Sequence, residues 1–153
     1  MSISNTIQNI KNTRIALLES IADLSIEQIN KIPEGFNNNI IWNVAHLAAT
    51  QQRLLYILSD LPIVIEDRHF SPFIRGTKPE KFITTEEFEK IKTVMISSLD
   101  QLLSDYEHGI FKTYQTFKTP YHVEITTIEE AIEFIPYHEG MHKGYILALR
   151  HLV

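Results

Sequence analysis

Apolar residues recur along most of this chain at spacings of three and four residues, the period of an amphipathic helix. The alternation of apolar and polar residues that marks a half-buried strand is rare, so the pattern predicts an almost entirely helical protein. Four long helices are expected, over residues 3–23, 40–59, 85–106 and 126–153. A short turn is expected at residues 25–31, and a short extended piece within residues 116–124.

Residues that cap helices mark where the predicted helices begin. The segment 84–87 has capping-box spacing, the segment 126–129 repeats it, and the three asparagines at 37–39 offer caps for the second helix. The connections at residues 61–83 and 107–125 are both long. This organisation predicts an all-α four-helix bundle with long second and third connections. Such bundles place metals and ligands in their cores.

The composition is that of one ordinary domain over residues 1–153, with 44% hydrophobic and 22% charged residues. Apolar runs are shorter than the roughly 18–20 residues of a membrane span, and the N-terminus lacks the features of a signal peptide. We therefore expect a cytoplasmic protein that does not enter a membrane. A formal net charge of −5 without a basic cluster argues against nucleic-acid binding and favours small molecules or protein partners.

Three histidines lie where the predicted helices face the core. His138 and His142 are one turn apart on the apolar stripe of the last helix, a spacing that brings side chains to roughly 5–6 Å. His46 lies within the apolar run of the second helix. Because the chain has no cysteine, a metal such as zinc would have to be held by His, Asp or Glu. A pair at this spacing also arises by chance, but three converging imidazoles would be difficult to satisfy with backbone carbonyls alone.

The segments around these histidines resemble the DinB/YfiT-like family of metal-binding four-helix bundles. The resemblance rests on residues 41–47 (IWNVAHL), on residues 138–150 (HEGMHKGYILALR) and on the order of the helices. It implies that His46, His138 and His142 are the ligands of one divalent metal ion, either zinc or nickel.

The segment 138–142 (HEGMH) also matches the HExxH pattern of zinc proteases. A zinc protease needs a third ligand farther along the chain. Only eleven residues follow His142, and Tyr145 and Ala148 stand where the extended protease pattern requires a glycine and a histidine. The sequence therefore argues against proteolysis.

Small residues form a ridge on the last predicted helix, at Gly140, Gly144 and Ala148. Because a glycine inside a helix costs about 1 kcal/mol relative to alanine, a close helix contact is the expected reason for the ridge. The contact would lie either within the chain or across a homodimer. The family resemblance favours a homodimer.

Three histidine ligands would leave a metal ion with an open position, as in catalytic sites. Because a bound ion lowers the pKa of water or of a thiol, two reactions on a small molecule are candidates. One is hydrolysis with Glu139 as a base. The other is S-transfer or isomerisation with a low-molecular-weight thiol as cosubstrate, and the resemblance implies this second reaction.

Several alternatives stay open. Glu139 could be no more than a solvated residue beside the site. The protein could be a non-catalytic metal- or ligand-binding stress-response protein, or the metal could be purely structural. His69, which lies beside Arg68 in a long connection, could bind an anionic substrate group together with Arg75, although a solvated loop is the simpler interpretation.

Overall fold

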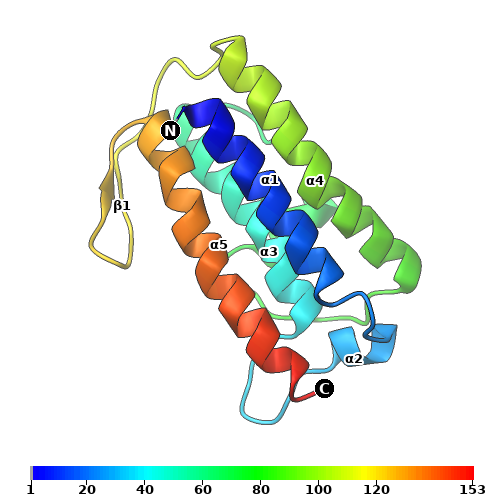
Figure 1. The fold of residues 1–153 in the computed structure, drawn as a ribbon. Coiled ribbons are helices and arrows are strands. Elements are labelled where there is room, and N and C mark those ends of the chain that lie inside the picture. Colours follow the sequence, from blue (N-terminus) through cyan, green and yellow to red (C-terminus); the bar gives the residue numbers. More distant parts are fainter. Residues whose placement is uncertain (1) are drawn as a thin grey trace.

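In the computed structural model, which describes residues 2–153, four long helices lie side by side and form a bundle (Figure 1). They are α1 (Ile3–Glu19), α3 (Ile40–Gln51), α4 (Thr85–Glu107) and α5 (Ile128–Arg150). Helices α1 and α3 each pack against both α4 and α5. The prediction of an all-α four-helix bundle is therefore confirmed.

The predicted second helix has the expected extent, but its hydrogen bonding changes part of the way along. Helix α3 continues into a π-helical turn, η1 (Gln52–Tyr56), and a 3-10 turn, η2 (Ile57–Ser59). The chain leaves the helix at Asp60, whose φ of 59° is left-handed, just before Leu61 and Pro62. Because π-helical turns often occur at functional sites, η1 indicates a candidate functional region of the bundle.

The connections contain short elements of their own. A single helical turn, α2 (Ile26–Asn30), lies in the first connection, and two 3-10 turns, η3 (Asp67–His69) and η4 (Ser71–Phe73), lie in the second. The third connection contains an antiparallel hairpin of β1 (Phe117–Lys118) and β2 (Glu124–Ile125), which confirms the predicted extended piece. The first long helix was predicted to reach residue 23, which is wrong, because regular helix ends at Glu19 and turns follow.

The predicted caps are formed by side chains that accept hydrogen bonds from the first turn of each helix. Thr84 and Glu87 form a reciprocal capping box at the start of α4. Asn39 accepts from the backbone N–H of Trp42 and so begins α3. At α5 the cap lies one residue later than the predicted spacing of 126–129, because Thr127 accepts from the backbone N–H of Glu130, and the Glu130 carboxylate accepts from the backbone N–H of Thr126. Local sequence therefore determines where these three helices begin.

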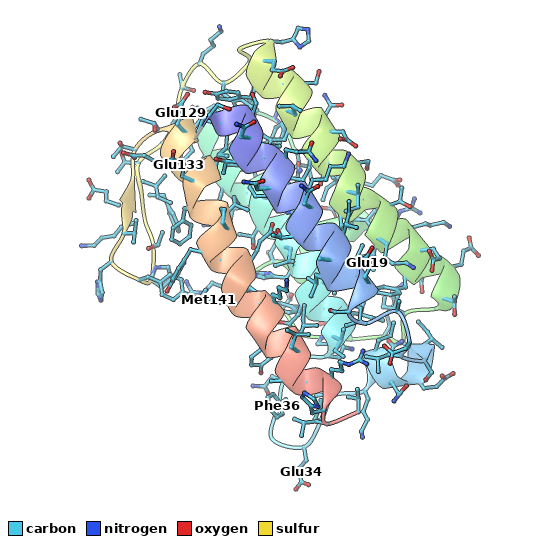
Figure 2. All side chains as sticks on the ribbon, viewed as in Figure 1. Glu19, Glu34, Phe36, Glu129, Glu133 and Met141 are labelled. Atoms are coloured by element: carbon cyan, nitrogen blue, oxygen red, sulfur yellow. The ribbon has the colours of Figure 1, made fainter. Side chains whose placement is uncertain are left out.

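The core occupies the space between the four helices, and charged side chains such as Glu19, Glu129 and Glu133 lie on the outer faces (Figure 2). Helix α1 departs from a simple apolar stripe at one place, because Ile15 is 40% exposed, whereas the neighbouring Arg14 is fully buried. None of the described helices is both long and apolar enough to cross a membrane.

Candidate metal centre

The three predicted ligands converge in the bundle. His46 projects from α3, and His138 and His142 project from the facing surface of α5, one turn apart. Their ring centroids lie 4.6 to 5.3 Å from one another. One nitrogen from each ring can be chosen so that the three atoms all lie within 4.8 Å of one another. The cluster could therefore hold one metal ion.

His46 is oriented by the connection that follows α3. The Phe73 backbone carbonyl lies 2.6 Å from Nδ1 of His46 and can only accept, so Nδ1 carries the proton. The Nε2 atom therefore carries no proton, and its lone pair accepts a hydrogen bond from the Thr50 hydroxyl at 3.1 Å. Because a hydroxyl can rotate, this lone pair is available to a metal ion.

His142 is oriented by Asn43, a polar residue within the apolar run of α3. The Nδ2 group of Asn43 donates to the backbone carbonyl of Asn39 at 2.8 Å, which directs Oδ1 toward the cluster. This Oδ1 lies 2.9 Å from Nδ1 of His142 and accepts a hydrogen bond from the Nδ1–H group. The second nitrogen of His142 is then unprotonated, as metal coordination requires. Asn43 was not predicted as a site residue, although a polar side chain inside the apolar run of residues 40–49 is a usable signal.

His138 has bonding capacity that the protein itself does not use. Its Nδ1 atom is buried and has no hydrogen-bond partner among residues 2–153. Because an unsatisfied buried polar atom costs free energy, we expect this imidazole to have a binding partner that is not part of the chain. A metal ion bound by the cluster would engage this imidazole, so the residues present fit such an ion.

The electrostatic environment keeps the cluster neutral. Burial, followed by the neighbouring His142 and His46 rings, lowers the pKa of His138 to about 3. Burial, followed by repulsion from the neighbouring His46 ring when that ring is protonated, lowers the pKa of His142 to about 4. Burial also lowers the pKa of His46, although its bond to Phe73 opposes this. At neutral pH all three imidazoles are therefore in the neutral form, in which one ring nitrogen is free to bind a metal ion.

Trp42 forms one wall of the site. Its indole stacks on the His46 ring with centroids 4.6 Å apart and planes 13° apart. The indole N–H donates to the Thr77 hydroxyl at 3.0 Å, and that hydroxyl lies 2.8 Å from the carbonyls of Pro72 and Ile74. The segment that accepts from His46 therefore also fixes Trp42.

The cluster opens into a cavity of about 590 Å³, a size that suits a small molecule. This histidine cavity is lined by residues of the segment before α3, of α3, η1 and α5, and of the second and third connections. Besides the three histidines, its aromatic lining consists of Trp42, Phe117, Tyr121 and Phe134.

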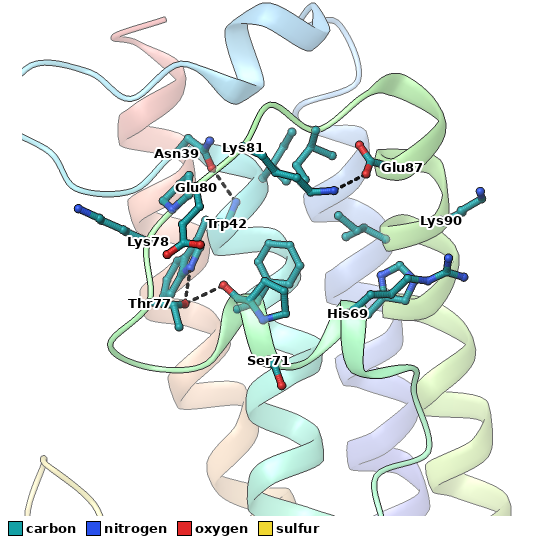
Figure 3. A pocket seen from close by; sticks show the side chains of 17 residues that line it. Asn39, Trp42, His69, Ser71, Thr77, Lys78, Glu80, Lys81, Glu87 and Lys90 are labelled. Atoms are coloured by element: carbon teal, nitrogen blue, oxygen red, sulfur yellow. Dashed lines mark hydrogen bonds and ion pairs between the residues drawn. The ribbon is translucent and has the colours of Figure 1, made fainter.

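A second cavity of about 640 Å³, drawn in Figure 3, adjoins the first. Trp42, Thr77 and Lys78 line both cavities. His69 and Arg68 line this second cavity, whereas Arg75 lines the histidine cavity. The three residues considered together in the sequence are therefore not brought into one site.

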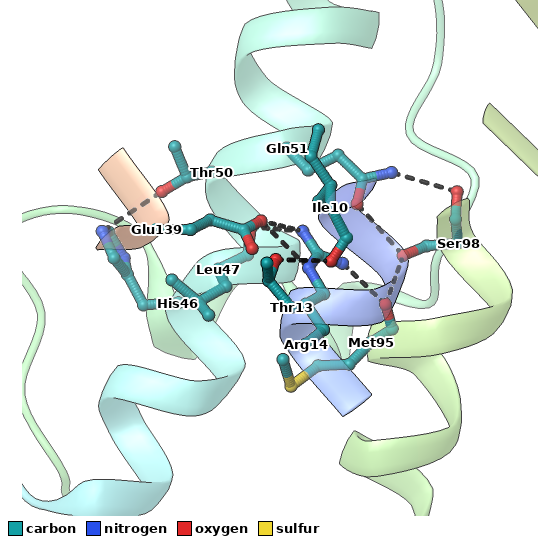
Figure 4. Close-up of polar contacts among 10 residues, drawn as sticks. All are labelled: Ile10, Thr13, Arg14, His46, Leu47, Thr50, Gln51, Met95, Ser98 and Glu139. Atoms are coloured by element: carbon teal, nitrogen blue, oxygen red, sulfur yellow. Dashed lines mark hydrogen bonds and ion pairs between the residues drawn. The ribbon is translucent and has the colours of Figure 1, made fainter. Parts of the chain in front are cut away.

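Glu139 lies beside the cluster in sequence but faces the other way. Its carboxylate oxygen Oε1 accepts from Nε and Nη2 of Arg14 at 2.9 and 2.7 Å (Figure 4). Arg14 also donates to the backbone carbonyls of Met95 and Leu47. Glu139 is only 6% exposed, so the alternative of a solvated residue is wrong. It does not line the histidine cavity, and its role as a base stays a prediction.

Arg14, the partner of Glu139, was not predicted from the sequence. A signal was present, because Arg14 shares three- and four-residue spacing with the buried Ile7, Ile10 and Leu17 of α1. A cation in the middle of an apolar stripe implies a buried anionic partner.

The small-residue ridge of α5 makes no close contact within the chain. Gly140 and Gly144 are exposed, and a β-carbon placed on either would meet no atom within 4 Å among the described residues outside its own turn. The intrachain explanation for the ridge is therefore wrong, and the homodimer stays a prediction.

Fold and site together define a helical-bundle protein with a three-histidine cluster that could bind a metal ion. The sequence matches the DinB superfamily over residues 9–146, and the chain belongs to that superfamily. The resemblance drawn from the two histidine segments is thereby confirmed. Curated proteins show no significant match to this sequence.

Proposed function

We propose that the protein binds one divalent metal ion, zinc or nickel, through His46, His138 and His142, and acts on a small molecule. The observation that carries this proposal is the convergence of three neutral imidazoles, one with an unpartnered buried nitrogen, at the end of an open cavity. A three-histidine set leaves coordination positions for a substrate, as catalytic sites do.

When bound, such an ion lowers the pKa of a thiol or a water molecule and so supplies a nucleophile at neutral pH. The protein's own residues orient the ligands, through the Phe73 carbonyl on His46 and the Asn43 amide on His142. The aromatic walls hold the apolar part of a substrate against the cluster and displace water from it.

Of the candidate reactions, thiol-dependent transfer or isomerisation is the better supported. No Asp or Glu is among the described residues that line the histidine cavity, and Glu139 is engaged by Arg14. Hydrolysis with Glu139 as its base is therefore not supported by this geometry, whereas thiol-dependent transfer needs no carboxylate of the protein, because the thiol can release its proton to solvent through the open cavity. The sulfur then forms a bond to an electrophilic carbon, and in a transfer the leaving group departs with the electron pair of its broken bond.

The absence of a carboxylate from the described cavity lining also favours a second candidate, a stress-response protein that captures a metal-coordinating ligand without turning it over. The two candidates differ in one measurement. Zinc- or nickel-loaded protein is presented with common low-molecular-weight thiols and electrophiles, and products are followed by mass spectrometry. Turnover that disappears in His138→Ala supports the enzyme, and tight binding of a thiol without product supports capture.

The metal itself is tested by elemental mass spectrometry on protein purified without an affinity tag. We expect about one equivalent in the wild type and far less in His46→Ala. His151→Ala is the matched control, because His151 is exposed beyond the end of α5, and it should retain the ion. Absence of metal from the wild type after reconstitution with zinc and with nickel would contradict the proposal.

A further inference from the structure

The charged residues around the histidine cavity all have the same sign. Arg53, Arg75 and Lys78 line it, and the described lining includes no Asp or Glu. The whole chain has the opposite bias, with 19 acidic and 14 basic residues. The cavity is therefore a local concentration of positive charge on an acidic protein.

The arginines of the chain differ in whether they have a carboxylate partner. The chain has five arginines, and three of them pair with carboxylates: Arg14 with Glu139, Arg68 with Glu66, and Arg150 with Asp23. Arg53 and Arg75 form no ion pair within residues 2–153, and both line the histidine cavity. The arginines that the protein leaves without a carboxylate are thus both at the site.

The two arginines approach the cavity from different elements. Arg53 belongs to the π-helical turn η1 that follows α3, and its guanidinium lies 6.0 Å from the Phe117 ring centroid. Arg75 follows η4 and precedes Gly76, whose φ of 95° belongs to the left-handed region. Both side chains are exposed, so they line the solvent side of the cavity and can meet a ligand as it enters.

We infer that the small molecule taken into the histidine cavity is an organic oxyanion, with its carboxylate or phosphate group at Arg53 and Arg75. A guanidinium presents a planar set of donors that matches either group. The aromatic residues hold the apolar body of the ligand, and its reactive end lies at the histidines. This inference rests on the proposed function, since it names the class of substrate for the same site.

The test uses three probes that share a phenyl group: 3-phenylpropionate, phenyl phosphate and the neutral 3-phenylpropanamide. Binding is measured by calorimetry and by the fluorescence of Trp42, which is the only tryptophan and lines the cavity. Each probe is titrated into zinc-loaded and metal-free protein, with zinc content measured on the same samples. The variants are Arg53→Gln/Arg75→Gln and, as a matched control, Arg68→Gln in the neighbouring cavity.

At least one of the two anions should bind about tenfold more tightly than the amide, with or without zinc, because the arginines belong to the chain. Arg53→Gln/Arg75→Gln should remove this preference and leave amide binding unchanged, while Arg68→Gln behaves as the wild type. Tighter binding of 3-phenylpropionate would identify the ligand's anionic group as a carboxylate, and tighter binding of phenyl phosphate would identify it as a phosphate.

Two results would overturn the inference. One is equal binding of the anions and the amide by the wild type. The other is an anion preference that persists in the double variant, which would place the anion on the metal ion or on another residue. Failure of the proposed metal site is recognised separately, because it appears as absence of zinc from the wild-type samples.

Discussion

Asn43 holds His142 in place through a hydrogen bond of 2.9 Å between the amide oxygen and the Nδ1–H group of the imidazole. The amide cannot turn over without losing its own bond to the Asn39 carbonyl. The two contacts together fix which nitrogen of His142 is free for a metal ion. Residues that orient a metal ligand in this way contribute to the affinity of the site for its metal.

Asn43→Ala is therefore expected to weaken zinc binding by about 10- to 100-fold while leaving all three ligands in place. The affinity is measured by competition with a chromophoric chelator. Asn12→Ala, on an exposed position of α1, serves as the control and should bind zinc as the wild type does. If Asn43→Ala kept full affinity, His142 would not depend on the amide for its orientation.

The metal-free protein should lose stability in mild acid because of its histidines. The pKa values of His138 and His142 are lowered to about 3 and about 4, from an ordinary value of 6.5. Between the ordinary pKa of 6.5 and these lowered pKa values, the unfolded chain binds protons that the folded protein does not. The free energy of unfolding therefore falls as the pH falls below 6.5. Urea denaturation in the presence of a chelator, at pH 7.5 and at pH 5, measures this loss.

The variant His138→Gln/His142→Gln isolates the histidine contribution, because glutamine does not titrate. Its free energy of unfolding should fall less than that of the wild type between the two pH values. Carboxylates such as Glu87, whose pKa is lowered to about 2 by Lys81 and the Thr84 backbone N–H, lose their contribution only at lower pH. Equal losses in the two proteins would mean that the folded cluster binds protons as readily as the unfolded chain.

The parts of the fold that could be predicted are those encoded within a few residues. The start of α4 follows from the reciprocal capping of Thr84 and Glu87, and the start of α3 from the Asn39 side chain. The end of α1 was less predictable, because turns rather than a proline or glycine follow Glu19. The π-helical turn η1 was not foreseen, since its residues read like the continuation of an ordinary helix.

The candidate site also has parts that could be predicted from the sequence and parts that could not. The candidate ligands His138 and His142 share one helix at a spacing visible in the sequence, and His46 lies in an apolar run that predicts a core position. The family resemblance joined the three into one predicted ligand set. The charged lining was not predictable, because Arg53 and Arg75 reach one cavity from elements whose relative placement depends on the packed bundle. Pairing across a fold leaves no local pattern, which is also why the partner of Arg14 was not foreseen.

The buried pair of Arg14 and Glu139 predicts a large effect from a single substitution. Arg14→Met removes the cation and leaves the Glu139 carboxylate buried without it, which should lower the free energy of unfolding by about 3–5 kcal/mol. Urea denaturation at pH 7.5 measures the loss. Arg68→Met, which removes an exposed pair with Glu66, should change the stability little. Partial recovery in Arg14→Met/Glu139→Gln would show that the unpaired carboxylate causes the loss.

Glu139→Gln separates a structural role of this carboxylate from a catalytic one. Glutamine has nearly the same shape and can still accept from Arg14, but it cannot take up a proton. If Glu139 acts only through Arg14, the variant should be less stable, with zinc content and any turnover per folded molecule unchanged. If it is a base, turnover should fall by about 100-fold or more in protein that is still folded and loaded with zinc. Turnover and the free energy of unfolding are therefore measured on the same preparation. Since Glu139 faces Arg14 and does not line the histidine cavity, we expect the first result.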